Sequence, residues 1–349
     1  VGPMRAVVFS VLTLSLCAPW TRGLRLAPSA PWTRGPHTAS TVHRLRTPAS
    51  GVHMSAATDW LVANGYSVED AKSSGASGWA SFSKLNAHRP DGTEVKLFVK
   101  TAARSAKEMF EGEALGLQAM HATKTIRVPA VEHYGDAKQG GSFLIMEYLD
   151  LRGSADPAEF GRKMAQMHLA VPAAPEARDE GMFGFNVDNT IGGTPQKNPW
   201  TKDWIEFFRE HRIGFQVKLS GSGELKREWD AALDRTDGLR TLFAGVGEIK
   251  PSTLHGDLWS GNMAGTSTNE PVIYDPATYY GHHEAEWGMS WCASLGPGFW
   301  RGYREVIPED AGFVERRALY EAYHKLNHLN LFGGGYMGDS VRLLKQLGR

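Results

Sequence analysis

Residues 255–262, with the sequence HGDLWSGN, and Asp275 thirteen residues after them constrain the fold of this 349-residue chain most strongly. Phosphoryl transfer from a nucleotide requires an acceptor for the proton of the attacking hydroxyl and hard oxygen ligands for magnesium. Catalytic loops of the kinase type supply them as an Asp, an Asn five residues later and a second Asp after the next strand. The spacing therefore predicts a phosphotransferase site in which Asp257 is the base and Asn262 and Asp275 bind Mg²⁺. The alternative is a glycine-containing turn between two ordinary strands.

The first 53 residues contain six Arg but no Lys, Asp or Glu, a composition that is typical of targeting segments. Their apolar stretch, residues 6–18, is shorter than the about 20 residues of a membrane-spanning helix and is typical of a signal-peptide core. We expect residues 1–53 to be a leader, cleaved or disordered, that directs the chain to a plastid (chloroplast) through the secretory route. Import into a mitochondrion, secretion, and a cytosolic form that starts at Met54 are the alternatives.

Composition narrows the classes of partner. Without residues 1–53, 32 basic residues face 38 acidic ones, which argues against a nucleic-acid partner. No stretch is long and apolar enough to predict a membrane span. Cys17 would leave with the leader, so Cys292 could form no internal disulfide, and no Cys/His spacing indicates a zinc site. The sequence leaves open whether the chain is a monomer or a dimer.

Residues 54–149 predict the smaller lobe of a bilobal, protein-kinase-like α+β fold, with a small antiparallel sheet and one main helix. A turn of small residues with Gly75, Ser77 and Gly78 would let backbone N–H groups approach the phosphates of ATP, although a tight hairpin explains the same residues. Lys100 ends the alternating run 95–100, where a kinase places the Lys that binds the α- and β-phosphates. The alternative is a solvated Lys at the end of a strand.

The helix that follows carries three Glu residues, and one of them is predicted to point inward. Ser105 and Glu108 predict a capping box at the start of this helix. Glu113 shares a helix face with four apolar residues, whereas Glu111 lies among charged and polar ones. Because a buried carboxylate is costly without a cation, we predict that Glu113 pairs with Lys100. The alternative is an ordinary surface Glu.

Residues 147–149 follow a predicted hairpin and fall where a connector between lobes would present the backbone of Glu147 and Leu149 to adenine. Residues 150–349 then predict a larger, mainly helical lobe that holds the catalytic loop, the metal site and the acceptor pocket. Helical patterns occur at residues 204–219, 225–243, 284–295 and 313–332.

The segment after Asp275 indicates a small acceptor. Protein kinases have a long activation loop there, ending in Ala-Pro-Glu, whereas here a helical pattern begins at Glu284 and no such tripeptide occurs between Asp275 and Glu284. Trp259 lies two residues after Asp257, so its ring can form one wall of an acceptor pocket. A flat apolar wall beside hydrogen-bonding groups suits a sugar. The alternative is a core Trp beneath the loop.

Several longer motifs resemble those of the fructosamine kinase (ketosamine-3-kinase) family, and they are spread over residues 56–347. They are HGDLWSGN at 255–262, VIYDPA at 272–277, YGH at 280–282, LNHLNLFG at 326–333, MFEGEAL at 109–115, FGF at 183–185, NTIG at 189–192 and DWIEFF at 203–208. The resemblance implies ATP-dependent, magnesium-requiring phosphorylation of the 3-hydroxyl of a ketosamine, the adduct of a sugar on an amine such as a protein lysine. Elimination of the phosphate then frees the amine, so the implied role is deglycation and protein repair.

Carried over to this chain, the resemblance implies the same roles for Asp257, Asn262, Asp275, Lys100 and Glu113 that the spacing predicts. It also implies that His328 contacts the acceptor. From its sequence neighbours alone, His328 is one half of an ordinary helical i,i+4 pair with His324. Trp79 departs from the family pattern, because some plant-type relatives have Cys at this position of the phosphate loop. A disulfide through that loop would lack its sulfur here.

Two other functions fit part of the pattern. An aminoglycoside or choline phosphotransferase would share Asp257, Asn262 and Asp275, but its cationic acceptor would call for acidic residues in the second lobe. A nucleotide-binding pseudokinase scaffold is expected to have lost a catalytic group, whereas all five are present here. The sequence leaves open which ketosamine sugar is used and whether the acceptor is free or protein-bound.

Overall fold

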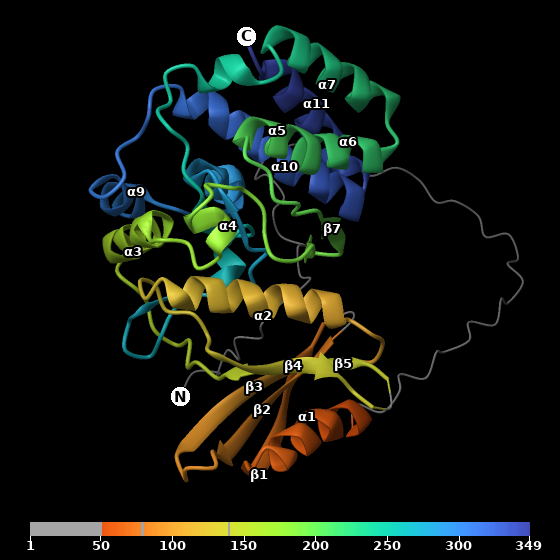
Figure 1. Cartoon of the computed structure of the whole chain (residues 1–349), viewed down its shortest axis with the longest axis vertical. Coiled ribbons are helices and arrows are strands. Elements are labelled where there is room, and N and C mark those ends of the chain that lie inside the picture. Colours follow the sequence, from red (N-terminus) through yellow and green to blue (C-terminus); the bar gives the residue numbers. More distant parts are fainter. Residues whose placement is uncertain (1–50, 78–79, 139) are drawn as a thin grey trace, which may run out of the picture.

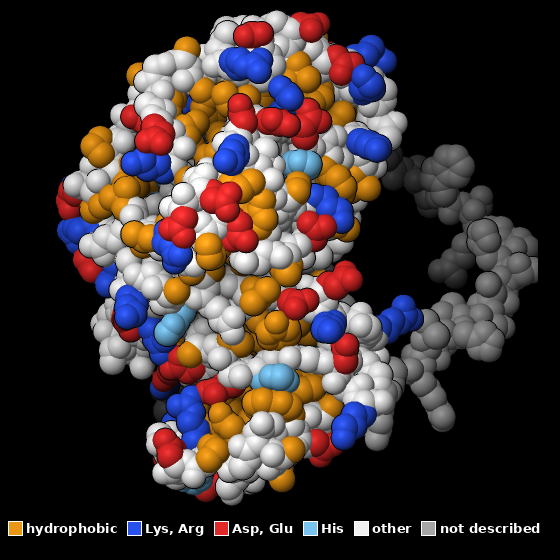
Figure 2. All heavy atoms as spheres, in the orientation of Figure 1, with side chains coloured by type: hydrophobic (Ala, Val, Ile, Leu, Met, Phe, Trp, Pro, Cys, Tyr) orange, Lys and Arg blue, Asp and Glu red, His pale blue; other side chains and the backbone are white. Residues whose placement is uncertain are grey.

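The computed structural model describes residues 51–77, 80–138 and 140–349. It has the bilobal architecture of the protein-kinase-like fold, with an antiparallel sheet in the smaller lobe and a mainly helical larger lobe (Figure 1). Among the described residues, no helix is both long and apolar enough to cross a membrane. Figure 2 shows basic and acidic side chains interspersed over the visible face of both lobes.

The smaller lobe is a five-stranded sheet with strand order β1-β2-β3-β5-β4, in which every neighbouring pair is antiparallel. A helix lies on each face, α1 on one and α2 on the other (Figure 1). The elements are α1 (Gly51–Ala63), β1 (Ser67–Ala76), β2 (Ala80–His88), β3 (Glu94–Ala102), α2 (Lys107–Ala122), β4 (Val131–Asp136) and β5 (Ser142–Glu147).

Strand β3 divides its side chains between the two faces of the sheet. Leu97 and Val99 are fully buried in the cluster beneath α1, whereas Phe98 belongs to the cluster beneath α2. Because side chains alternate along a strand, Lys100 lies on the same face as Phe98. The alternation therefore directs Lys100 toward α2 and the larger lobe.

The predicted capping box at the start of α2 is wrong. The helix begins at Lys107 with Ala106 at the N-cap, and no side chain caps it. The N–H of Ala106 instead donates to Oγ of Ser142 on β5 at 2.9 Å. A tertiary contact with the sheet thus replaces the local cap that Ser105 and Glu108 indicated.

The larger lobe contains the four predicted helical regions, but only one is a single regular helix. Region 313–332 is α10 from end to end, 204–219 contains a π-helical turn, 225–243 ends in a separate 3-10 turn, and 284–295 is mostly 3-10. The elements are α3 (Pro157–Leu169), α4 (Pro175–Arg178), β6 (Asn189–Ile191), β7 (Thr194–Gln196), α5 (Trp204–Phe208), η1 (Arg209–Gly214), α6 (Phe215–Ser220), α7 (Gly223–Arg235), η2 (Arg240–Phe243), β8 (Ser252–Leu254), η3 (Ser260–Asn262), β9 (Met263–Gly265), β10 (Pro271–Ile273), β11 (Tyr279–Gly281), η4 (His283–Met289), α8 (Ser290–Ala293), α9 (Pro297–Arg304), α10 (Phe313–Phe332), η5 (Gly334–Tyr336) and α11 (Met337–Gln346).

Candidate active site

Two short antiparallel pairs, β8 with β11 and β9 with β10, deliver the catalytic loop and the segment after it. The loop turns at Gly256, which has a φ of +81° and lies against the backbone of residue 277. A Cβ at this position would lie 2.2 Å from the carbonyl oxygen of Ala277, so only glycine fits. His255 is buried beneath the turn, where its Nε2 donates to the carbonyl of Tyr274 at 2.9 Å and its Nδ1 accepts the N–H of Asp257 at 3.2 Å.

A buried carboxylate that sequence reasoning missed holds this loop in place. Glu286 accepts the backbone N–H of His255 at 2.7 Å and that of Gly256 at 2.9 Å. Its Oε2 also lies 3.3 Å from Nε2 of His168. Burial acts to raise the pKa of Glu286, but His168 and His255 outweigh it, and the net pKa is lowered. Glu286 is therefore a charged anchor for the two residues that precede Asp257.

Asn262 joins the two predicted aspartates. Its Nδ2 donates to the backbone carbonyl of Asp257 at 2.9 Å and to that of Asp275 at 3.2 Å, and lies 3.4 Å from Oδ2 of Asp257. Because the amide nitrogen serves these contacts, the amide oxygen of Asn262 stays available as a ligand. Asp275 lies two residues after the end of β10 and has a φ of +57°. This is a left-handed conformation, which Asp tolerates better than most residues.

The predicted ion pair between Lys100 and Glu113 is present. Nζ of Lys100 lies 2.7 Å from Oε1 of Glu113 and also contacts Oδ1 of Asp275, and its side chain is fully buried. Burial acts to lower the pKa of Lys100, but attraction by Asp275 and Glu113 outweighs it and raises the pKa. Lys100 thus links the sheet, α2 and the catalytic segment at one ammonium group.

Close approach of α2 to the larger lobe makes this contact possible. A Cβ at Gly116 would lie 2.7 Å from Oγ1 of Thr278, and one at Gly112 would lie 2.5 Å from Cβ of Asn189. Asn189, the first residue of the NTIG motif, donates from Nδ2 to the carbonyl of Thr278 at 2.8 Å. The loop therefore supports the backbone just after Asp275.

The carboxylates of the site are crowded. Burial, with repulsion by Asp275 and Glu286, raises the pKa of Asp257 to about 8. Burial raises the pKa of Glu113 to about 7 against the attraction of Lys100. A cation bound between Asp257 and Asp275 would offset the repulsion between them and favour their charged forms.

The donor set fits magnesium. Oδ2 of Asp275 is buried and has no hydrogen-bond partner, which is costly for a carboxylate oxygen unless another group binds it. Mg²⁺ prefers carboxylate and amide oxygens together with phosphate oxygens and water. Asp275 and the amide oxygen of Asn262 are groups of this kind.

The structure describes only some of the residues that are predicted to contact the phosphates of ATP. β1 and β2 form the predicted hairpin, and Gly75 has a φ of +137°. The backbone N–H of Ser77 donates to the carbonyl of Ala80 at 2.7 Å, and its Oγ accepts the N–H of Ala80 at 3.1 Å. Gly78 and Trp79 lie outside the described residues.

The predicted connector between the lobes begins where β5 ends. The side chain of Glu147 contacts the guanidinium of Arg127 and accepts the N–H of Ala130 at 3.3 Å. Leu149 is buried against Val272 and Tyr274. Both side chains are therefore engaged within the protein, and the backbone N–H of Glu147 also donates to the carbonyl of Ala130 at 2.8 Å.

The two predicted acceptor residues differ in burial. Trp259 is half-buried, and its indole covers Gly261, where a Cβ would lie 2.2 Å from the ring. His328 is buried on α10, with Nδ1 bonded to the carbonyl of His324 at 2.7 Å. Nε2 of His328 has no hydrogen-bond partner. A partly open ring and an unpaired buried nitrogen are both compatible with a contact to an acceptor.

Comparisons with known proteins identify relatives of this chain. The family model described as fructosamine kinase matches residues 79–349. A protein-ribulosamine 3-kinase, chloroplastic, from Arabidopsis thaliana is 44% identical over 82% of this chain and 85% of its own length. A ketosamine-3-kinase from Mus musculus is 36% identical over 80% of this chain and 96% of its own length.

Solved structures with the same fold include a fructosamine kinase and an aminoglycoside phosphotransferase. A putative fructosamine-3-kinase from Thermobifida fusca is 30% identical, with a TM-score of 0.70 over 84% of this chain and 98% of that one. An aminoglycoside phosphotransferase shares the fold at 14% identity, with a TM-score of 0.53 over 83% of this chain and 95% of that one. The extent of the family match and the identity of the relatives show that the chain belongs to the fructosamine kinase family.

Proposed function

We propose that this protein transfers the γ-phosphoryl group of ATP to the 3-hydroxyl of a ketosamine. One observation carries the proposal: Asp257, Asn262 and Asp275 meet at a single site, and the buried Lys100–Glu113 pair joins them there. The names of family members, ribulosamine 3-kinase and ketosamine-3-kinase, supply the acceptor class.

In this mechanism the residues act mainly by position and charge. Asp257 accepts the proton of the 3-hydroxyl while the hydroxyl oxygen attacks the γ-phosphorus, and the bond to ADP breaks. Lys100, oriented by Glu113, binds the α- and β-phosphates. Asn262 and Asp275 would hold Mg²⁺, which neutralises charge on the phosphates when bound. The backbone around Gly75 and Ser77 would cover the phosphates, and that of Glu147 and Leu149 would meet the adenine.

The acceptor side is proposed to be formed by Trp259 and His328. The half-buried indole of Trp259, two residues after Asp257, provides a flat wall for the sugar. The unpaired Nε2 of His328 provides a hydrogen bond to it. Once phosphate is on C3, elimination followed by hydrolysis frees the amine, which makes the reaction a deglycation step.

The proposed location is the plastid. The composition of residues 1–53 and the two plant relatives from Arabidopsis thaliana and Oryza sativa, both named chloroplastic, support it. Residues 1–50 themselves lie outside the described part of the chain. Fusing residues 1–53 to a fluorescent protein in plant cells tests the location, and a cytosolic or mitochondrial signal would contradict it.

The activity is tested by incubating the full chain with Mg-ATP and fructosyl-, ribulosyl- and erythrulosyl-lysine, and by locating the phosphate with ³¹P and ¹³C NMR. We expect a phosphate ester on C3. An aminoglycoside and choline serve as competing acceptors. Transfer to either of them in place of the ketosamines would favour the related phosphotransferase function, and nucleotide binding without any transfer would favour a pseudokinase.

A further inference from the structure

A cavity of about 640 Å³ lies in the larger lobe, away from the proposed active site. It opens between the connection from α3 to α4, the segment 246–251 and the start of η4, with Ser252 of β8 in its wall. None of the catalytic, metal-binding or acceptor residues proposed above lines it. The catalytic loop leaves the other end of β8, so this short strand separates the two sites.

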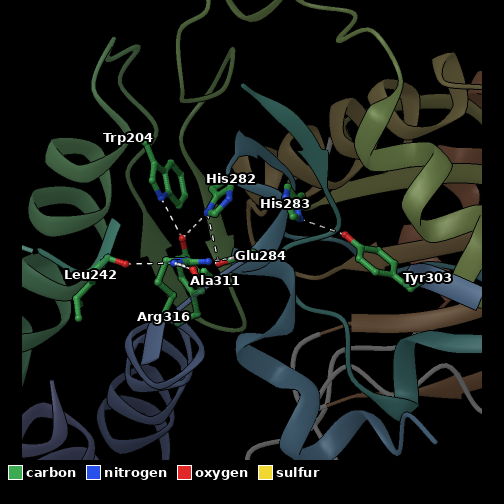
Figure 3. A network of polar contacts seen from close by, with 9 residues as sticks. Trp204, Leu242, His282, His283, Glu284, Tyr303, Ala311 and Arg316 are labelled. Carbon is green, nitrogen blue, oxygen red and sulfur yellow. Dashed lines mark hydrogen bonds and ion pairs between the residues drawn. The ribbon is translucent and has the colours of Figure 1, made fainter. Parts of the chain in front are cut away.

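Three histidines, His168, His282 and His283, line one side of this cavity, its floor, and the side chain of His168 is itself fully buried. Their rings lie close together, with centroids 4.7 Å apart for His282 and His283 and 6.4 Å apart for His168 and His283. Each ring is fixed through Nδ1 by a tyrosine hydroxyl, that of Tyr303 for His168 and His283 and that of Tyr320 for His282. Figure 3 shows His282 and His283 beside the contact of His283 with Tyr303.

The remaining nitrogens of two of these rings are unused. In the part of the chain that the structure describes, the hydrogen bonds of His282 and His283 are made through Nδ1, to Tyr320 and Tyr303, and none is made through Nε2. No group of three metal-ligating side chains among the described residues is arranged to hold a metal ion. The free nitrogens therefore suit a hydrogen-bonding ligand and not a metal.

The charges around the floor favour a ligand that carries negative charge. Both nearby carboxylates are already engaged, because Glu284 forms a two-point pair with Arg316 at 2.6 and 2.8 Å (Figure 3) and Glu286 holds the catalytic loop. Burial, with repulsion by His168 and Arg316, lowers the pKa of His283 to about 3. An anion placed on the floor would accept hydrogen bonds from these imidazoles and pair with Arg178 at the rim.

The rim offers both charge and apolar surface. Arg178 and Lys250 line it, and each is paired only in an exposed ion pair, with Asp179 and Glu248 respectively. Exposed pairs contribute little, so both cations can turn to a ligand. Asp310 and Glu248 also line the rim, so the two cations and two carboxylates there balance. The preference for a charged ligand therefore depends on the groups of the floor. The wall contributes Leu169 and Val171, two large hydrophobic side chains that are 62% and 70% exposed.

Glu286 connects the floor of the cavity to the catalytic loop. His168 contacts Glu286 through Nε2, and Glu286 accepts the N–H groups of His255 and Gly256 immediately before Asp257. A ligand that shifts the imidazoles would change the hydrogen bonding of Glu286 and so the position of the loop.

We propose that this cavity is an effector site for a small organic anion, a phosphate ester or a carboxylate on a body with an apolar face, and that its occupancy is transmitted to the catalytic loop through His168 and Glu286. The volume is in the range of sites for small molecules. The anionic group would bind the imidazole floor with Arg178, and the apolar body would cover Leu169 and Val171. The site does not depend on the function proposed above.

Binding is tested by isothermal titration of the full chain with phenyl phosphate, benzoate and the neutral benzyl alcohol, with Mg-AMP-PNP present to occupy the nucleotide site. We expect both anions to bind and the alcohol not to bind. Arg178→Gln and His283→Asn should each weaken the anions about tenfold, the cost of one hydrogen bond to a charged group. Lys226→Gln, an equal charge change at an exposed site on α7, should have no effect. Equal affinity in all four proteins, or no binding by the wild type, would overturn the site.

Transmission is tested by hydrogen exchange of the peptide amides at residues 254–258, with and without phenyl phosphate. We expect the ligand to change exchange of the His255 and Gly256 amides in the wild type but not in Arg178→Gln. Unchanged exchange despite binding would overturn the effector role. Because neither measurement needs phosphoryl transfer, failure here is distinct from failure of the proposed kinase activity.

Discussion

The carboxylate of Glu286 accepts the backbone N–H of His255 at 2.7 Å, although the two residues are 31 positions apart. A second bond to the N–H of Gly256 fixes the turn that presents Asp257. We predict that Glu286→Gln lowers kcat about 10- to 100-fold, because a charge-assisted acceptor is lost beneath the loop. The KM for Mg-ATP should change little, since Glu286 is not one of the residues proposed to bind the nucleotide. Steady-state kinetics check this, and a wild-type kcat would contradict the positioning role.

Asp257→Asn should abolish turnover while nucleotide binding survives. The substitution keeps the shape of the side chain but removes the group that accepts the hydroxyl proton, and loss of such a base costs about 10²- to 10⁴-fold in rate. Titration of the variant with Mg-AMP-PNP should give a dissociation constant close to that of the wild type. Ketosamine phosphorylation at the wild-type rate would show that another group is the base.

Asp275→Asn should weaken the response to magnesium. The unpaired Oδ2 of Asp275 is the oxygen best placed to bind the ion, and an amide is a poorer ligand for a hard cation than a carboxylate. We expect the magnesium concentration for half-maximal rate to rise, and EDTA to abolish the activity of the wild type. Identical magnesium dependence in both proteins would place the ion elsewhere.

Glu113→Gln should raise the KM for ATP, whereas Glu111→Gln should not. Glu113 lies 2.7 Å from Nζ of Lys100, while Glu111, on the same helix, accepts a bond from the Tyr134 hydroxyl at 3.3 Å. Loss of the charged partner should cost about tenfold in the apparent affinity for ATP. The two variants make the same chemical change on α2, so equal KM values for them would argue against an oriented Lys100.

His283 should make the protein less stable in mild acid. Burial, with repulsion by His168 and Arg316, lowers its pKa in the folded state to about 3, against 6.5 for the free side chain. Between these values the unfolded chain binds more protons, so the contribution of His283 to stability is lost as the pH falls through this window. Other groups, such as Glu113, titrate with the opposite sign, and a variant is therefore needed to isolate the effect.

Urea unfolding of the wild type and His283→Asn at pH 7.5 and 5.5 measures this contribution. The variant should gain about 1.4 kcal/mol relative to the wild type between the two pH values, which corresponds to about one pH unit below 6.5. A difference in stability that does not change with pH would show that His283 has the same pKa in the folded and unfolded chains.

Local patterns predicted much of the site because each predicted feature had a short-range signal. The spacing of Asp257, Asn262 and Asp275 is fixed by the turn and strand that separate them. The inward position of Glu113 follows from the helical period, and its pairing with Lys100 from the cost of an unpaired buried carboxylate. The family resemblance pointed to the same residues and also supplied the chemistry of the acceptor.

Features that depend on tertiary contacts were not predictable in this way. Glu284 and Glu286 lie in a 3-10 segment. Its three-residue turn matches neither the helical nor the strand period that would mark them as buried. The capping box at Ser105 failed because Ser142, on β5, binds the N–H of Ala106. The helix expected at 204–219 contains a π-helical turn, in which Gly214 lies against the backbone of Arg209.

The contact of Lys100 with Asp275 has a thermodynamic consequence. One ammonium neutralises the carboxylate that would otherwise bind magnesium, so an incoming triphosphate must compete with Asp275 for that charge. In the proposed mechanism, a nucleotide that replaces Asp275 beside Lys100 frees the carboxylate of Asp275 to bind the metal ion that the nucleotide carries. By reciprocity, a bound ion favours release of Lys100 to the phosphates. Uptake of metal and of nucleotide would therefore be cooperative.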